Sequence, residues 1–252
     1  MFDKERHIQI INSLYKNHSI SVNDIADKLH VSPSTIRRDL KELEKNGLVE
    51  RTHGGAIIAQ EVENNLNYNT KKTKNYDLKL KIAKMAAEEI KDGDIVLLNS
   101  STITSLMPQF IKARNITVIT NSINIIQNLK EKESCDVIVL GGIFLSNAET
   151  VEGPTTVNQI LTMTYDKMFV GANGIDTNFG FSTASELESA SKIAGINQST
   201  ETYFLCEHTK FNRCALYKIC PLSSATYLIT DNEVDQKIID EYSKHLNIKI
   251  AE

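Results

Sequence analysis

The sequence predicts an α/β protein with an N-terminal winged helix-turn-helix and a larger C-terminal domain built on a mostly parallel sheet. The first observation is that three short helical patterns fall within the first fifty residues and are followed by a Gly-Gly turn. The second is that strand-length apolar runs alternate with amphipathic helical patterns from Asp77 onward. This alternation is typical of a parallel sheet covered by helices on both faces.

Composition sets the expected domain boundaries. We predict a winged helix-turn-helix domain at residues 1–58, a linker at 59–76 and the second domain at 77–252. The linker is polar and rich in Asn and Lys, with too few apolar positions to form a core.

Three helices are predicted in the first domain. Lys4–Tyr15 has apolar residues at helical spacing, and Ser21–Asp24 has the Ser-x-x-Asp form of a capping box that opens a short helix ending at Leu29. Only His30–Ser32 separates this helix from the third one. Such a short connection is expected of a helix-turn-helix whose last helix enters the DNA major groove.

The third helix is predicted from its cap and its two faces. Ser32 suits the N-cap, Pro33 suits the first helical position, and Gly47 suits the helix exit. A helix of mixed charge is usually a solvated surface, but the two helices before it favour a recognition helix. Its apolar side is formed by Ile36, Leu40 and Leu43, its polar and basic side by Ser34, Arg38, Lys41 and Lys45, and Asp39, Glu42 and Glu44 are expected on the flanks.

A β-wing is predicted after the helices. Leu48–Ile58 alternates enough to form two short strands around Gly54-Gly55. Residues 1–60 carry nine Lys/Arg and eight Asp/Glu, a formal charge of +1, whereas residues 61–252 carry −5. Because this domain is nearly neutral, DNA affinity must depend on the placement of its cations and on two copies acting together.

The predicted contacts to double-stranded operator DNA divide into two kinds. Residues near the helix N-terminus are expected to read base edges, and the later cations to contact phosphates. The DNA-binding candidates are Ser32, Ser34, Thr35, Arg37, Arg38, Lys41, Lys45, Arg51, His53 and Gly54.

Length and composition narrow the class of protein. With 252 residues and 41% hydrophobic residues, the chain can bury a large core, and its longest apolar runs are strand-length. The charged N-terminus predicts no signal peptide, so we expect a cytoplasmic protein without a membrane span. Its four cysteines form no C-x-x-C pair and are expected to be reduced thiols, with no metal and no cofactor.

The second domain is predicted to alternate helices and strands. Expected helices are Lys79–Ile90, Thr104–Lys112, Asn124–Lys130, Pro154–Thr162, Ala184–Gln198 and Asp235–His245. Expected strands are Asp94–Leu98, Ile116–Ile119, Asp136–Leu140, Lys167–Val170, Thr202–Leu205 and Tyr227–Ile229. Ligands of such a sheet bind beyond the carboxyl ends of the strands.

Small polar residues follow several of these strands and predict an anion site. Hydroxyls and backbone N–H groups at a helix start favour a phosphate or carboxylate, although a Ser or Thr there is more often a simple cap. The effector-binding candidates are Ser100, Ser101, Thr102, Thr120, Asn121, Ser122, Gly141, Gly142, Lys192 and Lys210.

Catalysis is the alternative use of this edge. His208 lies beside Glu207, but adjacent residues on an extended segment point in opposite directions. The chain contains no Gly-x-Ser-x-Gly motif, no P-loop and no metal-ligand cluster. An anion site without an evident base suits a sensor better than an enzyme.

Several of these segments resemble one known family. Val31–Leu40, Leu43 and Arg51–Ala56 are similar to the N-terminal signature of the DeoR family of bacterial sugar-metabolism repressors. The resemblance continues through Asp92–Asp94, Val118–Ser122, Leu140–Gly142, Val170–Asp176, Lys210–Phe211 and Ile229–Asp231. It implies that residues 77–252 form an effector-sensing and oligomerisation domain, similar in fold to ribose-5-phosphate isomerase, that binds a phosphorylated sugar.

The resemblance thus implies a transcriptional regulator, a repressor that acts as a dimer or tetramer and responds to a phosphorylated sugar. An activator, or an isomerase-like enzyme with a DNA-binding appendage, are the alternatives. Asn99–Ile103 departs from the Asp-Ser-Gly-Thr/Ser-Thr common in the family, and Glu207 stands where Asp is common. These departures bear on which effector is bound.

Overall fold

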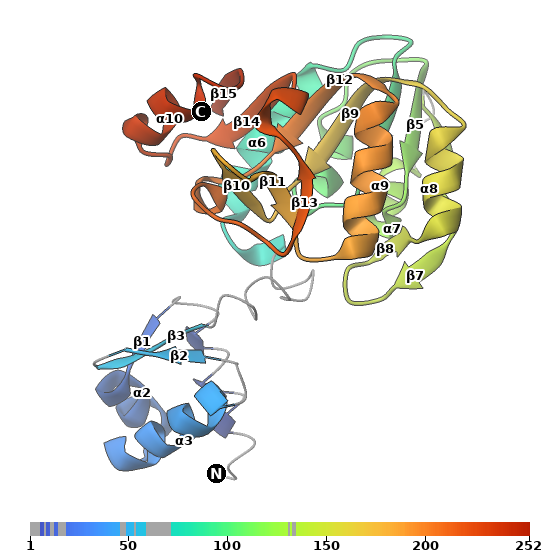
Figure 1. Cartoon of the computed structure of the whole chain (residues 1–252). Helices are drawn as coiled ribbons and strands as arrows, with labels where there is room; N and C mark the ends of the chain where they lie inside the picture. The colour runs from blue at the N-terminus through green and yellow to red at the C-terminus, as the bar shows by residue number, and fades with distance from the viewer. Residues whose placement is uncertain are drawn as a thin grey trace. The chain divides into compact units, whose positions relative to one another are not determined.

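The computed structural model describes residues 6–7, 9–10, 13–14, 19–45, 49–52, 54–58, 72–130, 132 and 135–252 (Figure 1). The chain divides into two compact units, Met1–Leu66 and Asn67–Glu252. Most of the predicted linker lies outside the described residues, so its boundaries stay a prediction.

The N-terminal unit contains the predicted helix-turn-helix and wing. Its elements are β1 (Ser19–Ser21), α2 (Val22–Leu29), α3 (Pro33–Lys45), β2 (Val49–Arg51) and β3 (Gly55–Ile58). The Ser21 hydroxyl accepts a hydrogen bond from the Asp24 N–H, as the capping box predicts. His30 ends α2 with φ of 54°, which turns the chain toward α3.

A small apolar core joins these elements. It contains Ile10 and Leu14 from the first predicted helix. Of that predicted helix, the structure describes residues 6, 7, 9, 10, 13 and 14, and all six are helical. α2 adds Val22, Ile25, Ala26 and Leu29, α3 adds Ile36, Leu40 and Leu43, and β2 and β3 add Val49 and Ala56. The strand β1 was not predicted from the sequence. It pairs antiparallel with β3 and makes the wing three-stranded, in the order β1-β3-β2.

The C-terminal unit is built on a seven-stranded sheet in which every neighbouring pair is parallel. Strand order reverses between β4 and β9, where a crevice for ligands is expected at the carboxyl ends. In spatial order the strands are β15 (Ile248–Ala251), β14 (Tyr227–Asp231), β12 (Ser199–Leu205), β9 (Tyr165–Gly171), β4 (Ile95–Leu98), β5 (Ile116–Thr120) and β6 (Cys135–Val139).

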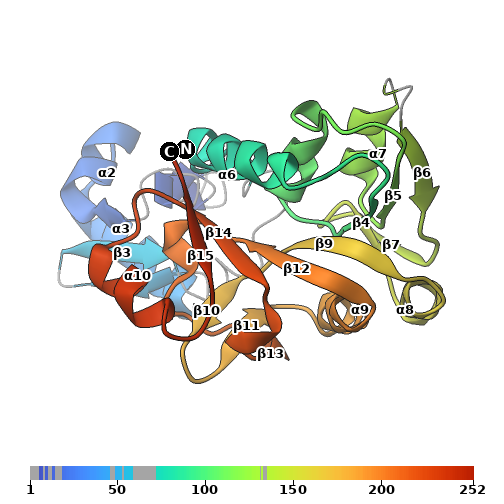
Figure 2. The same cartoon turned by 90° about the horizontal axis from the view of Figure 1, so that it is seen from above.

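Helices cover both faces of this sheet. Figure 2 shows α6 (Tyr76–Glu88) and α7 (Ile123–Leu129) on one face and α8 (Pro154–Leu161) and α9 (Glu186–Asn197) on the other. Side chains alternate accordingly, since Val96 and Leu98 of β4 join the core under α6 while Leu97 joins the core that includes Ala194 of α9. The last helix is α10 (Gln236–Tyr242), whose Tyr242 belongs to this second core.

Short elements account for most differences from the sequence prediction. The predicted helix Thr104–Lys112 is a 3-10 helix, η1 (Thr104–Gln109), which contains Pro108. Unpredicted strands form a hairpin, β7 (Ile143–Leu145) with β8 (Thr150–Glu152), and a second small sheet of β10 (Gly174–Asp176), β11 (Gly180–Thr183) and β13 (Tyr217–Cys220). β15 was also missed, and η2 (His208–Lys210) and η3 (Leu222–Ser224) are further 3-10 turns.

Within these described ranges, no helix combines the length and the apolar character needed to cross a membrane.

Candidate functional site

Helix α3, the predicted recognition helix, begins at a side-chain cap formed by Ser32. The Thr35 N–H donates to Ser32 Oγ at 3.2 Å, and the hydroxyls of Ser34 and Thr35 lie 2.7 and 2.8 Å from the same oxygen. Ile36, Leu40 and Leu43 are buried, as the periodicity predicts. Of the predicted DNA-binding residues here, Ser32, Ser34, Arg37, Arg38 and Lys41 are exposed and Thr35 is half-buried.

Asp39 is a correction to the expected helix faces. It was placed on a flank of α3, but it is 2% exposed and accepts hydrogen bonds from Arg6 Nε at 2.5 Å and Nη2 at 2.8 Å. Since Asp39 follows Ile36 by three positions, it shares the buried face. A buried bidentate ion pair therefore joins the first helical segment to the recognition helix.

Two of the wing residues predicted to contact DNA have partners within the protein. Arg51 Nη1 lies 3.6 Å from Glu44 Oε2, and the Arg51 N–H donates to Glu44 Oε1. Gly54 is exposed, and its carbonyl accepts from the Val22 N–H. His53 and the side chain of Lys45 lie outside the described residues.

In the C-terminal unit, the predicted polar segments meet at the carboxyl edge of the sheet. The Ser100 N–H donates to Asn121 Oδ1 at 3.0 Å, which joins the segments after β4 and β5. A Cβ on Gly171, at the end of β9, would lie 2.8 Å from Ser101 Cβ. This edge is the point where strand order reverses.

Some predicted effector residues have internal roles at this edge. Thr120 Oγ1 donates to the Leu98 carbonyl and accepts from the Ser122 N–H. Gly142 has φ of +151°, and a Cβ there would lie 2.3 Å from Thr156 Oγ1. The Gly141 N–H is bonded to Gln159, and the Thr102 carbonyl accepts from Ser105.

The anion argument for the first loop also changes. The element that follows is a six-residue 3-10 helix, whose Thr104 N–H is bonded to Ser101 Oγ at 3.0 Å. The loop therefore contributes less positive potential than the start of a full α-helix would.

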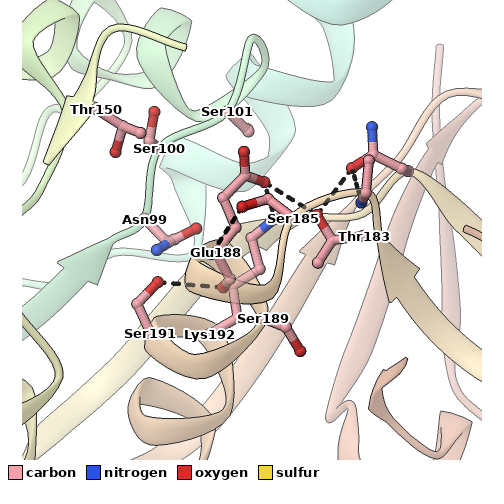
Figure 3. A network of polar contacts seen from close by, with 12 residues as sticks. Asn99, Ser100, Ser101, Thr150, Thr183, Ser185, Glu188, Ser189, Ser191 and Lys192 are labelled. Carbon is pink, nitrogen blue, oxygen red and sulfur yellow. Dashed lines mark hydrogen bonds and ion pairs between the residues drawn. The ribbon is translucent and has the colours of Figure 1, made fainter. Parts of the chain in front are cut away.

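Lys192 is a buried cation at this edge. It is 3% exposed, and its Nζ lies 3.3 Å from Glu188 Oε2 and 3.5 Å from Thr183 Oγ1. Figure 3 shows Asn99, Ser100 and Ser101 across from this group on α9.

Lys210 belongs to a second charged cluster, centred on the buried carboxylate of Glu207. Lys210 Nζ lies 3.7 Å and Lys79 Nζ 3.9 Å from Glu207, and Asn75 Nδ2 donates to Glu207 Oε2 at 3.0 Å. Burial lowers the pKa of Lys79 to about 8, with Glu207 opposing that shift and Lys210 adding to it. Lys210 follows Leu205, the last residue of β12, by five residues, so this cluster lies at the carboxyl end of that strand.

Buried polar atoms without partners mark the same edge. Among the described residues of this unit they belong to Asn99, Ser122, Glu152, Thr209 and Thr230. Native proteins rarely leave such atoms unsatisfied, so each calls for a bound group or water. Of these, the sequence prediction included only Ser122. No motif marked Glu152, because its strand β8 was not predicted.

The surroundings of His208 bear on the catalytic alternative. Its Nδ1 is 2.9 Å from Asp231 Oδ1, its Nε2 is 3.6 Å from Glu233 Oε2, and its backbone N–H donates to Asp231 Oδ2, so both ring nitrogens lie beside carboxylates. All four cysteines are free, and the described residues contain no group of three His, Cys, Asp or Glu side chains arranged to hold a metal ion.

The two units together define a class: a helix-turn-helix protein that binds DNA, combined with an α/β domain that senses a ligand. Comparison with known families identifies the family to which the chain belongs. A model described as DeoR-like helix-turn-helix domain matches residues 6–62, and one described as DeoR C terminal sensor domain matches residues 74–232. The chain belongs to the DeoR family of transcriptional regulators.

Named relatives agree with this assignment. The chain is 31% identical to the lactose phosphotransferase system repressor of Lactococcus lactis, with 100% of both chains covered. It is 32% identical to the regulator GolR of Listeria innocua, also over 100% of both. It is 31% identical to the repressor GlcR of Bacillus subtilis, over 95% of this chain and 93% of that one. These names confirm a regulator and do not favour the isomerase-like enzyme.

Solved structures show only a distant likeness. A translation initiation factor eIF-2B of Pyrococcus horikoshii is 15% identical with a TM-score of 0.46, covering 85% of this chain and 74% of that one. Ribose 5-phosphate isomerase A of Methanocaldococcus jannaschii is 18% identical with a TM-score of 0.39, covering 54% and 55%. The fold class rests on the sheet itself, which confirms the predicted parallel α/β domain.

Proposed function

We propose that this regulator represses a sugar-metabolism operon in the cytoplasm and that a phosphorylated sugar relieves repression. It binds operator DNA through α3 as a dimer or tetramer. The effector lies at the carboxyl edge of the seven-stranded sheet, with Lys192 and Lys210 neutralising its phosphate.

The observation that carries this proposal is the set of unpartnered buried polar atoms at the same edge of the sheet as the two lysines. A polyhydroxylated anion satisfies both, since its hydroxyls supply hydrogen-bond partners and its phosphate a negative charge. Relatives named as repressors of sugar transport systems support the same ligand class.

The DNA-binding proposal rests on the exposed side of α3. Arg37, Arg38 and Lys41 are exposed on a helix that is capped by Ser32 and held by the Arg6–Asp39 pair. Phosphate contacts supply salt-dependent affinity and base contacts supply specificity.

A route from effector to DNA begins at Glu207. This carboxylate contacts Lys210 and also Asn75, the residue just before α6, which lies near the end of the predicted linker at 59–76. A phosphate that attracts Lys210 away from Glu207 changes the contacts that hold Asn75. The ligand must bind the two arrangements with different affinity, since equal affinity shifts nothing.

The effector is tested by thermal shift with sugar phosphates and the same sugars without phosphate. We expect only the phosphorylated forms to raise Tm, because a ligand stabilises the state that binds it. Lys210→Ala should weaken that shift, whereas Lys237→Ala, which removes an exposed lysine of α10, should not. Equal shifts for both variants would remove Lys210 from the site.

DNA binding is tested by gel-shift titration over a range of salt. Arg38→Ala should weaken operator binding about tenfold or more, about 1–3 kcal/mol if a base contact is lost. Lys237→Ala again serves as the control of equal charge change. An unchanged affinity and salt slope for Arg38→Ala would refute its placement at the interface.

The coupling route is tested with Asn75→Gly. Glycine accepts the positive φ of 51° at this position while removing the amide that bonds Glu207. We expect the variant to bind effector and DNA but to release DNA less when effector is added. A wild-type response would exclude this contact from the route.

A further inference from the structure

Glu152 is a buried carboxyl group that no sequence motif singles out. It ends β8 and is 1% exposed. Its Oε1 accepts from Asn121 Nδ2 at 2.9 Å and from Thr150 Oγ1 at 3.5 Å. Its Oε2 has no hydrogen-bond partner among the described residues, because the neighbouring Ser191 hydroxyl donates to the Glu188 carbonyl instead.

The groups that face Glu152 come from two elements. Asn121 follows β5, while Ser191, Glu188 and Lys192 come from α9. Burial raises the pKa of Glu152 to about 7, and Glu188 adds to that rise, whereas Ser191, Lys192 and Asn121 oppose it. Near neutral pH the carboxyl is therefore present in both protonation states.

Asn99 completes the same polar group. It is 1% exposed, and its side chain lacks a partner at both Oδ1 and Nδ2 among the described residues. Its backbone is fully used, since its N–H donates to the Phe169 carbonyl and its own carbonyl accepts from Thr104 Oγ1. Asn121 links the two residues' segments by bonding Ser100 N–H through Oδ1 and Glu152 through Nδ2.

We propose that Glu152 and Asn99 are the specificity-determining residues of the effector site, binding the hydroxyl groups of a ligand whose anionic group is neutralised by Lys192. This inference rests on the proposed function and names the residues that distinguish one polyol phosphate from another.

The chemistry of these atoms fits hydroxyl recognition. A hydroxyl both donates and accepts, so it satisfies Glu152 Oε2 in either protonation state. The Asn99 amide offers one acceptor and two donors and suits a neighbouring hydroxyl. A site built to hydrogen-bond a hydroxyl discriminates strongly against a ligand that lacks it, because its buried polar groups are then left unpaired.

The position of Glu152 also links binding to protons. A phosphate dianion beside the Lys192 ammonium repels an ionised Glu152, so the complex favours the protonated carboxyl. Affinity should therefore weaken as pH rises above 7, by up to about tenfold per pH unit until the carboxyl ionises in the complex as well.

The test measures binding by isothermal titration calorimetry on the full chain. The probes are glucose 6-phosphate, fructose 6-phosphate, fructose 1-phosphate and ribose 5-phosphate, with inorganic phosphate as the anion without carbon-bound hydroxyls. Titrations between pH 6.5 and 8.5 in buffers of different ionisation enthalpy report the protons taken up.

We expect one sugar phosphate to bind wild type at least tenfold more tightly than inorganic phosphate. Asn99→Ala and Glu152→Ala should remove that preference while leaving inorganic phosphate affinity within about threefold. Glu152→Gln keeps the shape of the side chain and should flatten the pH dependence and reduce proton uptake. Glu241→Gln, at an exposed acid of α10, is the matched control and should behave as wild type.

The two ways of failing are distinguishable. If wild type binds a sugar phosphate tightly and both Glu152 variants keep its affinity and its pH profile, this inference is wrong while the proposed function stands. If no probe binds wild type, the proposed function fails and this inference fails with it. Should Glu152→Ala not fold, Glu152→Gln and its proton uptake still decide the question.

Discussion

Gly55→Ala is the sharpest test of how the wing is built. A Cβ at Gly55 would lie 1.7 Å from the carbonyl oxygen of Ile20 and 2.8 Å from its carbonyl carbon. These are backbone atoms of β1, so no side-chain rotation relieves the clash. Reaching even 3.0 Å requires the two atoms to separate by 1.3 Å.

A shift of that size disrupts the β1–β3 ladder. The ladder has three residue pairs, Ser19↔Ile57, Ile20↔Ala56 and Ser21↔Gly55. Overpacking costs about 1–3 kcal/mol and each lost backbone hydrogen bond about 1 kcal/mol. We therefore expect a loss of about 2–4 kcal/mol in the stability of the N-terminal unit.

Hydrogen exchange on the full chain measures this loss locally. Amides of α2 and of the wing should exchange about 30-fold to several hundred-fold faster in Gly55→Ala, since about 1.4 kcal/mol corresponds to tenfold. Gly54→Ala is the control one residue away, where a Cβ meets nothing within 4 Å. Equal protection in the two variants would refute the close approach of β1 to β3.

Three further outcomes are expected. Asp39→Asn removes the carboxylate that offsets the charge of buried Arg6 and should lower the free energy of unfolding in urea by about 3–5 kcal/mol. The control Glu42→Gln, at an exposed acid of α3, should lower it by under about 0.5 kcal/mol. Equal losses in the two variants would contradict a buried pair. Burial raises the pKa of Glu152 to about 7, so the folded state binds more protons than the unfolded chain between about pH 4.5 and 7. The free energy of unfolding should therefore fall by up to about 3 kcal/mol as pH rises through that window. Glu152→Gln should abolish this contribution. Burial raises the pKa values of Cys206 and Cys220 to about 12, so a thiol reagent at pH 8 should label exposed Cys214 before either of them. Rapid labelling of Cys206 or Cys220, located by peptide mapping, would contradict this ranking.

Local signals explain what could be predicted from the sequence. The caps at Ser21 and Ser32 and the spacing of Ile36, Leu40 and Leu43 define α2 and α3 without tertiary information. Strands that are apolar throughout defined the parallel sheet in the same way, because both of their faces are buried.

Elements that depend on distant partners were not predictable. β1 and β15 have only three and four residues and are fixed by pairing with β3 and β14. Asp39 shares a helix face with Ile36, but the cation that makes its burial favourable, Arg6, lies 33 residues away. Tertiary pairing decides such positions, and local propensity does not.

The candidate site also contains residues that local sequence patterns predict and residues that only tertiary contacts reveal. Ser100, Asn121 and Lys210 could be proposed because they follow strands or belong to a recognisable segment. Glu152 could not, since it reaches Asn121 from a hairpin 31 residues further along the chain. Its role depends on a contact that no sequence spacing encodes.

The contact between Asn75 and Glu207 allows ligand binding to change the start of the sensor domain through a single hydrogen bond. Asn75 stands at the beginning of the domain, and Glu207 two residues after β12 ends. The chain thus enters the domain at the edge where ligand is proposed to bind. Occupancy can be reported by loosening or tightening this entry point alone, while the seven-stranded sheet stays rigid.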